Sequence, residues 1–201
     1  MLRTILSNVL LALVALILVI TNGCATNDAM TDKEGAILAL TLQRSYQYGG
    51  FAVVSPDTDV SELGGGNSTK ADHCKKFVLN GLQTNDPDVV NLVDKFFERN
   101  KKTIRLSIKS SPRDGYLIDR DGNFEKYFKK GGGGWDKWRI ENPKAHVSLR
   151  VSMPVYDEKS GFVLIYIGQV VDALMGSGRV ILFKQENGKL KYVKAVEIWI
   201  S

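Results

Sequence analysis

Residues 127–139, which read YFKKGGGGWDKWR, form the segment whose side chains are best suited to ligand contact. Four aromatic and four basic residues flank four consecutive glycines. Aromatic faces and cations together suit glycans, peptides or lipid headgroups, and Trp and Arg are common anchors of binding surfaces. The residues expected to make such contacts are Lys129, Lys130, Trp135, Trp138 and Arg139. The competing interpretation places both tryptophans in the core and treats the glycines as a flexible linker.

No segment carries a signature of nucleophilic catalysis, so no catalytic residue is assigned. Ser177 stands between two glycines, which we interpret as a turn between strands. Cys74 and His146 would form a thiol–imidazole pair only if the fold brought them together. Cys74 falls on the apolar stripe of a predicted helix, which favours a buried, inert thiol over a reactive one or a disulfide with Cys24. The sequence therefore favours a protein that is not an enzyme.

Metal and cofactor sites have equally little support in the sequence. The chain has two histidines, and they do not form the spaced ligand pairs typical of zinc sites. Alternating polar residues from Asp119 to Glu125 are similar to a calcium-binding loop, but Lys130 stands where the twelfth-position acid belongs. A hairpin turn made from Asp-Gly explains this segment better. We therefore predict no metal and no cofactor.

The first 23 residues differ in composition from the rest of the chain. Arg3 is the only charged residue before Asp28, and residues 9–20 form an unbroken apolar run. Such a run after a basic start is typical of an export signal, whereas a membrane-spanning helix needs about 20 apolar residues. An uncleaved membrane anchor and a buried core helix are the alternatives.

Residues 20–24, Ile-Thr-Asn-Gly-Cys, resemble the lipobox of bacterial lipoproteins. The resemblance implies removal of residues 1–23 as a signal peptide, lipid attachment at Cys24 and a short tether over residues 24–30. It also implies outer-membrane attachment facing the periplasm, because Ala25 replaces the Asp that favours inner-membrane retention. Thr21 and Asn22 depart from the residues that are usual at these positions of the family's motif. Cleavage after Ala25, which would release a secreted protein, is the alternative.

The composition of the 201 residues is that of an ordinary folded protein. Hydrophobic residues make up 44% and charged residues 24%, which argues against disordered, collagen-like and multi-span membrane classes. The formal net charge is +5, and removal of residues 1–23 takes away only Arg3 among the charged residues. This small excess predicts no nucleic-acid partner.

Helices are predicted mainly in the first half of the chain. The first begins near Thr31, because Thr31 and Glu34 match the capping-box pattern. A second helix over residues 70–82 has its apolar residues on one stripe. A third begins at Pro87, where a missing N–H costs nothing, and carries a core-facing stripe. A short helix is also predicted over residues 135–141.

Strands are predicted mainly in the second half, where apolar and polar residues alternate. The predicted strands are residues 51–54, 103–109, 116–118, 147–153, 162–168, 179–184 and 190–200. Asn187-Gly188 predicts a hairpin before the last of them. Helices followed by strands predict an α+β fold in two layers, with the N-terminal helices packed on a curved antiparallel sheet. Residues 31–201 are expected to form this single domain.

The C-terminal third resembles a group of exported bacterial proteins that have no assigned activity. The resemblance rests on the alternating strand at residues 147–153, the apolar run at residues 162–168 and the ending Ile198-Trp199-Ile200-Ser201. It implies a β-meander and no particular chemistry.

These features together predict a lipid-anchored protein of the bacterial cell envelope whose globular domain binds or scaffolds a partner. The expected partners are the membrane, through the lipid anchor, and another envelope protein or a glycan such as peptidoglycan. One alternative is an exported hydrolase that acts on envelope material. Another is an inhibitor-like or immunity-like lipoprotein that binds one protein partner. An exposed apolar surface around Trp135 and Trp138 would favour that last alternative.

Overall fold

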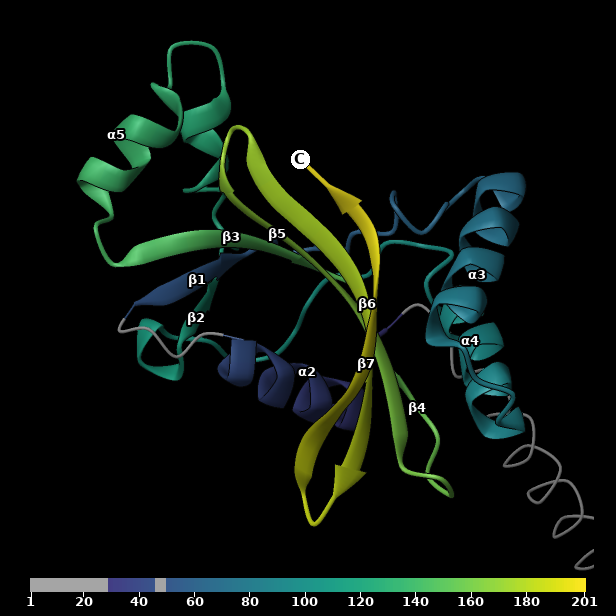
Figure 1. The fold of residues 1–201 in the computed structure, drawn as a ribbon. Helices are drawn as coiled ribbons and strands as arrows, with labels where there is room; N and C mark the ends of the chain where they lie inside the picture. The colour runs from purple at the N-terminus through teal and green to yellow at the C-terminus, as the bar shows by residue number, and fades with distance from the viewer. Residues whose placement is uncertain (1–28, 46–49) are drawn as a thin grey trace, which may run out of the picture.

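A computed structural model of the chain describes residues 29–45 and 50–201 and confirms the α+β class (Figure 1). The helices are α2 (Asp32–Ser45), α3 (Ser68–Leu82), α4 (Pro87–Arg99) and α5 (Gly134–Glu141), with two 3-10 turns, η1 (Pro112–Asp114) and η2 (Glu125–Phe128). The strands are β1 (Phe51–Val54), β2 (Tyr116–Ile118), β3 (Ala145–Val151), β4 (Val155–Tyr156), β5 (Phe162–Asp172), β6 (Met175–Glu186) and β7 (Lys189–Ile200).

The strands form one mixed sheet in the order β2-β1-β3-β5-β6-β7, with β4 paired beside β5. The predicted C-terminal meander is confirmed, because β5, β6 and β7 pair antiparallel in sequence. The expectation of a wholly antiparallel sheet needs correction, because β1 runs parallel to both β2 and β3. The chain passes through α3 and α4 between β1 and β2, and through η2 and α5 between β2 and β3. Such long connections permit parallel pairing.

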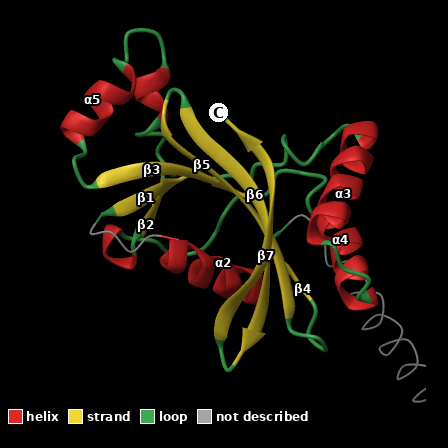
Figure 2. Ribbon diagram, viewed as in Figure 1, coloured by secondary structure: helices red, strands yellow, loops and turns green. Residues whose placement is uncertain are grey.

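Helices cover both faces of the sheet, so the predicted two layers become three (Figure 2). The central strand β5 gives the reason. Its Val163 and Ile165 side chains lie in the apolar cluster beneath α2. Its Leu164 and Tyr166 side chains lie in the cluster beneath α3 and α4. Because successive strand residues point to opposite faces, a strand that is apolar on both faces needs cover on both.

Local capping explains where the helices begin. The predicted capping box at the start of α2 is confirmed, because the Glu34 N–H donates to Thr31 Oγ1 at 3.2 Å and the Thr31 N–H donates to Glu34 Oε2 at 2.7 Å. α3 begins earlier than predicted, because the Asn67 side chain accepts a hydrogen bond from the Lys70 N–H at 3.0 Å. α4 begins at Pro87, as predicted.

Residues 103–109 do not form the predicted strand. Ile104 and Leu106 are buried, as their alternation implies, but the segment runs beside the loop that follows β1. The Thr58 N–H donates to the Ile104 carbonyl at 2.9 Å, and the Leu106 N–H donates to the Pro56 carbonyl at 2.8 Å. The alternation therefore predicted the buried residues correctly. It does not specify the hydrogen-bond partners of the backbone, and these lie in a loop instead of a neighbouring strand.

Residues 176–178 lie within β6 instead of forming the predicted turn. The hairpin between β5 and β6 turns at Ala173 and Leu174. The two glycines of the triplet continue the ladder, since Gly176 and Gly178 pair with residues of β5. Glycines are common in turns, which explains the error, but here they leave a strand face without side chains.

The segment from η2 to α5 forms a small aromatic unit on the β1–β3 end of the sheet, opposite α2 (Figure 1). Tyr127 and Trp138 are buried there against Val53 of β1 and Ala145 of β3. The Tyr127 hydroxyl donates to Glu141 Oε2 at 2.5 Å and thereby joins η2 to α5. This bond also raises the pKa of Tyr127.

Candidate functional site

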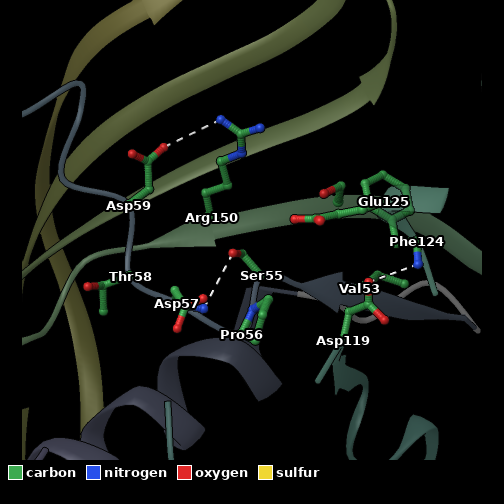
Figure 3. A pocket seen from close by; sticks show the side chains of 11 residues that line it. Val53, Ser55, Pro56, Asp57, Thr58, Asp59, Asp119, Phe124, Glu125 and Arg150 are labelled. Carbon is green, nitrogen blue, oxygen red and sulfur yellow. Dashed lines mark hydrogen bonds and ion pairs between the residues drawn. The ribbon is translucent and has the colours of Figure 1, made fainter. Parts of the chain in front are cut away.

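A strip of the sheet stays open between the two covers on the face opposite α2. The α3–α4 cover buries Tyr166, and the η2–α5 cover buries Val53. Ser148 and Arg150 alternate on β3 and face the strip between these covers. Two adjoining hollows open there, one of about 240 Å³ (Figure 3) and one of about 370 Å³, and we term them together the β3 groove. The residues that line both hollows are Phe124, Glu125, Ser148 and Arg150.

Aromatic side chains form one wall of the β3 groove. Phe124, Phe128 and Trp135 line it, with ring centroids 4.8 Å apart for Phe124 and Phe128 and 5.0 Å apart for Phe128 and Trp135. The buried Trp138 supports them from behind, 5.4 Å from the Trp135 centroid at an interplanar angle of 84°. Such edge-to-face contacts hold the rings in place. Phe128 is 43% exposed and Trp135 is half-buried, so both present accessible ring surface.

Two carboxylates of the groove lining, those of Asp119 and Asp57, already bind groups of the protein itself. Asp119 is buried and accepts hydrogen bonds from the N–H groups of Asn123 at 2.7 Å and Phe124 at 2.8 Å. It therefore shapes the turn that leads into η2. Asp57 lies 3.2 Å from the Arg105 guanidinium in an exposed ion pair. Neither carboxylate is fully available to a ligand.

Arg150, Glu125 and Lys129 are the charged groove residues with unused hydrogen-bonding capacity. The Arg150 guanidinium makes one long ion pair, 3.7 Å from Nη1 to Asp59 Oδ2, and its side chain is 63% exposed. Within the described residues, the side chains of Glu125 and Ser148 make no hydrogen bond or ion pair. Figure 3 shows the Arg150 and Glu125 side chains and the Ser55 hydroxyl around the same hollow. A ligand there would meet a donor fork, an acceptor and hydroxyl groups.

Only some of the predicted binding residues line the β3 groove. Lys129 and Trp135 line the β3 groove. Trp138 is 2% exposed and belongs to the core beneath the unit, as the competing interpretation held. Lys130 is exposed and does not line either hollow.

Arg139 anchors α5 to the sheet. Its Nη2 donates to the Val171 carbonyl at 3.0 Å and to Asp172 Oδ2 at 2.7 Å. The bond from Arg139 holds the pKa of the Asp172 carboxyl below its ordinary value. Arg139 therefore positions the aromatic wall relative to β5 and lies outside the groove lining.

The sequence pattern does not single out Glu125, Phe128 or Arg150 as groove residues. Arg150 occupies a polar position of an alternating strand, which usually indicates a solvent-facing side chain. Its role becomes visible only because the η2–α5 unit packs beside it on the same face. The signal available in the sequence was the aromatic and basic segment at residues 127–139, which contains Phe128.

The thiol–imidazole pair finds no support in the structure. Cys74 is buried in the cluster beneath α3 and α4, and this burial raises the pKa of its thiol. A buried, protonated thiol is a poor nucleophile. His146 lies elsewhere, on an exposed position of β3 beside Gly50. Among residues 29–45 and 50–201, no three His, Cys, Asp or Glu side chains lie together as a metal site would require.

Cys24 and the apolar run at residues 9–20 lie outside the described residues. In the part of the chain that the structure describes, no helix has the length and apolar character needed to cross a membrane. Comparison of the chain with protein-family models, with characterised proteins and with solved structures finds no match. Functional inference therefore depends on the β3 groove itself.

The β3 groove is equipped to bind a ligand and lacks a nucleophile paired with a base. Its lining contains serines but neither cysteine nor histidine. Rigid aromatic surface beside a few convergent polar groups is the usual composition of a small-molecule or glycan site.

Proposed function

We propose that this protein is a lipid-anchored component of the bacterial cell envelope whose domain binds a glycan in the β3 groove. One observation carries the glycan assignment. Arg150 and Glu125, which have unused hydrogen-bonding groups, line the same hollow as the accessible rings of Phe128 and Trp135.

A sugar presents two kinds of surface, and the groove has a counterpart for each. The C–H face of a pyranose packs against aromatic rings, as Phe128 and Trp135 offer. Neighbouring hydroxyl groups donate to a carboxylate and accept from a guanidinium, as Glu125 and Arg150 offer. The lining carries charges of both signs, since Glu125 lies beside Arg150 and Lys129, and this mixture favours a hydroxyl-rich ligand over a strongly anionic or cationic one.

The envelope location rests on the N-terminal sequence and on how the domain begins. The apolar run and the lipobox-like residues 20–24 support export and lipid attachment at Cys24. Arg99 Nη2 donates to the Ala29 carbonyl at 2.6 Å, which fixes the start of the domain to α4. The five residues 24–28 then span at most about 18 Å of extended chain between bilayer and domain. Ala25 after Cys24 supports attachment to the outer membrane, and on its periplasmic side peptidoglycan is the accessible glycan.

Membrane fractionation with intact mass measurement tests the anchor. The wild-type chain is expected to lose residues 1–23, gain acyl mass and pellet with membranes in a bacterial host. Cys24→Ala is expected to lose the acyl mass and the pelleting. A mature mass that begins at Thr26, or persistence of the full chain, would contradict lipid attachment.

Co-sedimentation with purified peptidoglycan sacculi tests the glycan assignment. Full-length protein in detergent is expected to bind, and Arg150→Ala and Phe128→Ala are each expected to weaken binding about fivefold to tenfold. Arg179→Ala and Phe77→Ala are matched controls, since these side chains are 50% and 48% exposed but lie outside the groove lining. Equal losses in the controls would remove the groove from consideration. Failure of the wild type to bind would overturn the peptidoglycan assignment.

A further inference from the structure

A second aromatic surface, formed by Trp199, lies on the same sheet face as the β3 groove, farther along the sheet toward β7. Arg150 on β3 pairs directly with Gly168 on β5. Gly168 pairs with Gly178 on β6, which in turn pairs with Trp199 on β7. Directly paired residues of antiparallel strands point to the same face of a sheet. Trp199 therefore shares the face that Arg150 and the groove occupy.

Three glycines lie between Arg150 and Trp199, and they make room for the Tyr166 hydroxyl, 2.7 Å from a Cβ added to Gly168, and for the Trp199 indole. Gly168, Gly176 and Gly178 lie on this face, and the Trp199 indole packs directly against the last two. A Cβ added to Gly178 would lie 2.1 Å from Trp199 Nε1, and one added to Gly176 would lie 3.0 Å from the indole ring. A side chain at either position would displace the indole. The absence of side chains at these glycines thus lets the indole pack directly on the backbone of the sheet.

Tyr166 fixes the orientation of the Trp199 indole. Trp199 Nε1 donates to the Tyr166 hydroxyl at 2.8 Å, and Tyr166 is 1% exposed. Burial raises the pKa of Tyr166 to about 12, so the phenol stays neutral at physiological pH. Trp199 itself is half-buried and keeps accessible surface. A ring already held in place loses little conformational freedom when a ligand stacks on it.

We infer that the glycan site continues from the β3 groove across the three glycines to Trp199, so that the ligand is an oligosaccharide chain. Strands lie about 4.8 Å apart, so the three steps from β3 to β7 cover about 14 Å. The Trp199 indole reaches back over Gly178 to the Tyr166 hydroxyl, whereas the aromatic wall of the groove lies on the other side of Arg150, at the β1–β3 end of the sheet. A ligand that stacks on both the aromatic wall and the indole must therefore extend beyond a single sugar ring. This inference rests on the proposed glycan-binding function and adds the length of ligand that the site selects.

A chain-length series tests the extended site. The probes are β-1,4-linked N-acetylglucosamine oligomers of increasing length, and the affinity of the full-length protein for each is measured by calorimetry. Wild-type affinity is expected to rise with length until the chain reaches Trp199. Trp199→Ala is expected to bind the monosaccharide as the wild type does and to lose about fivefold to tenfold in affinity for the longest oligomer. Phe128→Ala is expected to weaken binding of every length.

The outcomes separate this inference from the proposed function. If the wild type binds all lengths equally, or if Trp199→Ala keeps the wild-type length dependence, the extended site is wrong while glycan binding stands. If no oligomer binds, both are overturned. Trp199→Met serves where Trp199→Ala fails to fold, because methionine still covers the glycines but offers no ring. Tyr166→Phe keeps the indole, frees its N–H and is expected to reduce only the gain from the longer oligomers.

Discussion

The Arg99 guanidinium binds the Glu34 carboxylate through two hydrogen bonds, 2.6 Å from Nε to Oε1 and 2.9 Å from Nη2 to Oε2. Their side chains are only 12% and 8% exposed. The pair joins α2 to α4, which pack on opposite faces of the sheet. Because Arg99 also binds the Ala29 carbonyl, the same contact holds the point where the proposed tether meets the domain.

Removal of Arg99 is expected to destabilise the fold strongly. Arg99→Ala leaves the Glu34 carboxylate largely buried and without its cationic partner, which costs about 3 kcal/mol in free energy of unfolding. Urea denaturation measures this change. Lys101→Ala is the control, since the exposed pair of Lys101 with Glu98 contributes less than about 1 kcal/mol. Similar losses in both variants would contradict a structural role for the Glu34–Arg99 pair.

The same pair makes stability depend on acidic pH. Burial alone would raise the pKa of Glu34, but hydrogen bonds from Arg99 and Thr31 outweigh burial and hold the pKa below its ordinary value of 4.5. A carboxyl whose pKa is lower in the folded state stabilises the fold above pH 4.5 and loses that contribution as the pH falls through the folded value. The free energy of unfolding should therefore differ between wild type and Glu34→Gln at pH 7, and the difference should shrink below pH 4.5. A difference that stays constant with pH would contradict this assignment.

Two aromatic residues of the η2–α5 unit should behave differently on truncation. Trp138 is 2% exposed, so Trp138→Ala is expected to lower the free energy of unfolding by about 3–5 kcal/mol. Phe128 is 43% exposed, so Phe128→Ala should cost clearly less stability while weakening glycan binding. Thermal denaturation and sacculus binding of both variants check this division. A stability loss at Phe128 as large as that at Trp138 would assign Phe128 to the core.

A methyl group at Gly178 should act through Trp199. Gly178→Ala places a Cβ where the Trp199 indole lies, and overpacking of this kind costs about 1–3 kcal/mol. Combination with Trp199→Ala removes the clash, so the cost of the glycine substitution should nearly vanish in that background. Urea denaturation of the two single variants and the double variant gives the coupling energy. Additive costs would show that Gly178 and the indole do not interact.

Several features of the fold follow from short sequence segments. The capping box at Thr31 and the stripe of α4 depend on residues within a few positions of one another, and the structure has both. The hairpin at Asn187-Gly188 likewise forms, because both residues adopt the positive φ that this turn needs. The apolar run of β5 indicated a central strand, and the same run explains why helices cover both faces.

Other features depend on contacts between distant segments and were predicted wrongly or not at all. The alternation at residues 103–109 reports burial but not the hydrogen-bond partner, which the loop after β1 supplies. The glycines at residues 176 and 178 predict a turn when only the local sequence is considered. The structure shows instead that they lie in a strand and leave room for the Trp199 indole, a contact with a distant segment. Parallel pairing of β1 also depends on crossovers that no local pattern encodes.

The sequence by itself determined the α+β class, the starts of α2 and α4 and the presence of the C-terminal strand meander, because capping, periodicity and turn chemistry act over a few residues. It also carries the lipobox-like segment from which the envelope proposal comes. Only the tertiary structure decided the composition of the β3 groove. Phe128, Arg150 and Trp199 belong to different elements and meet on one sheet face because strand register and the packing of the η2–α5 unit place them there.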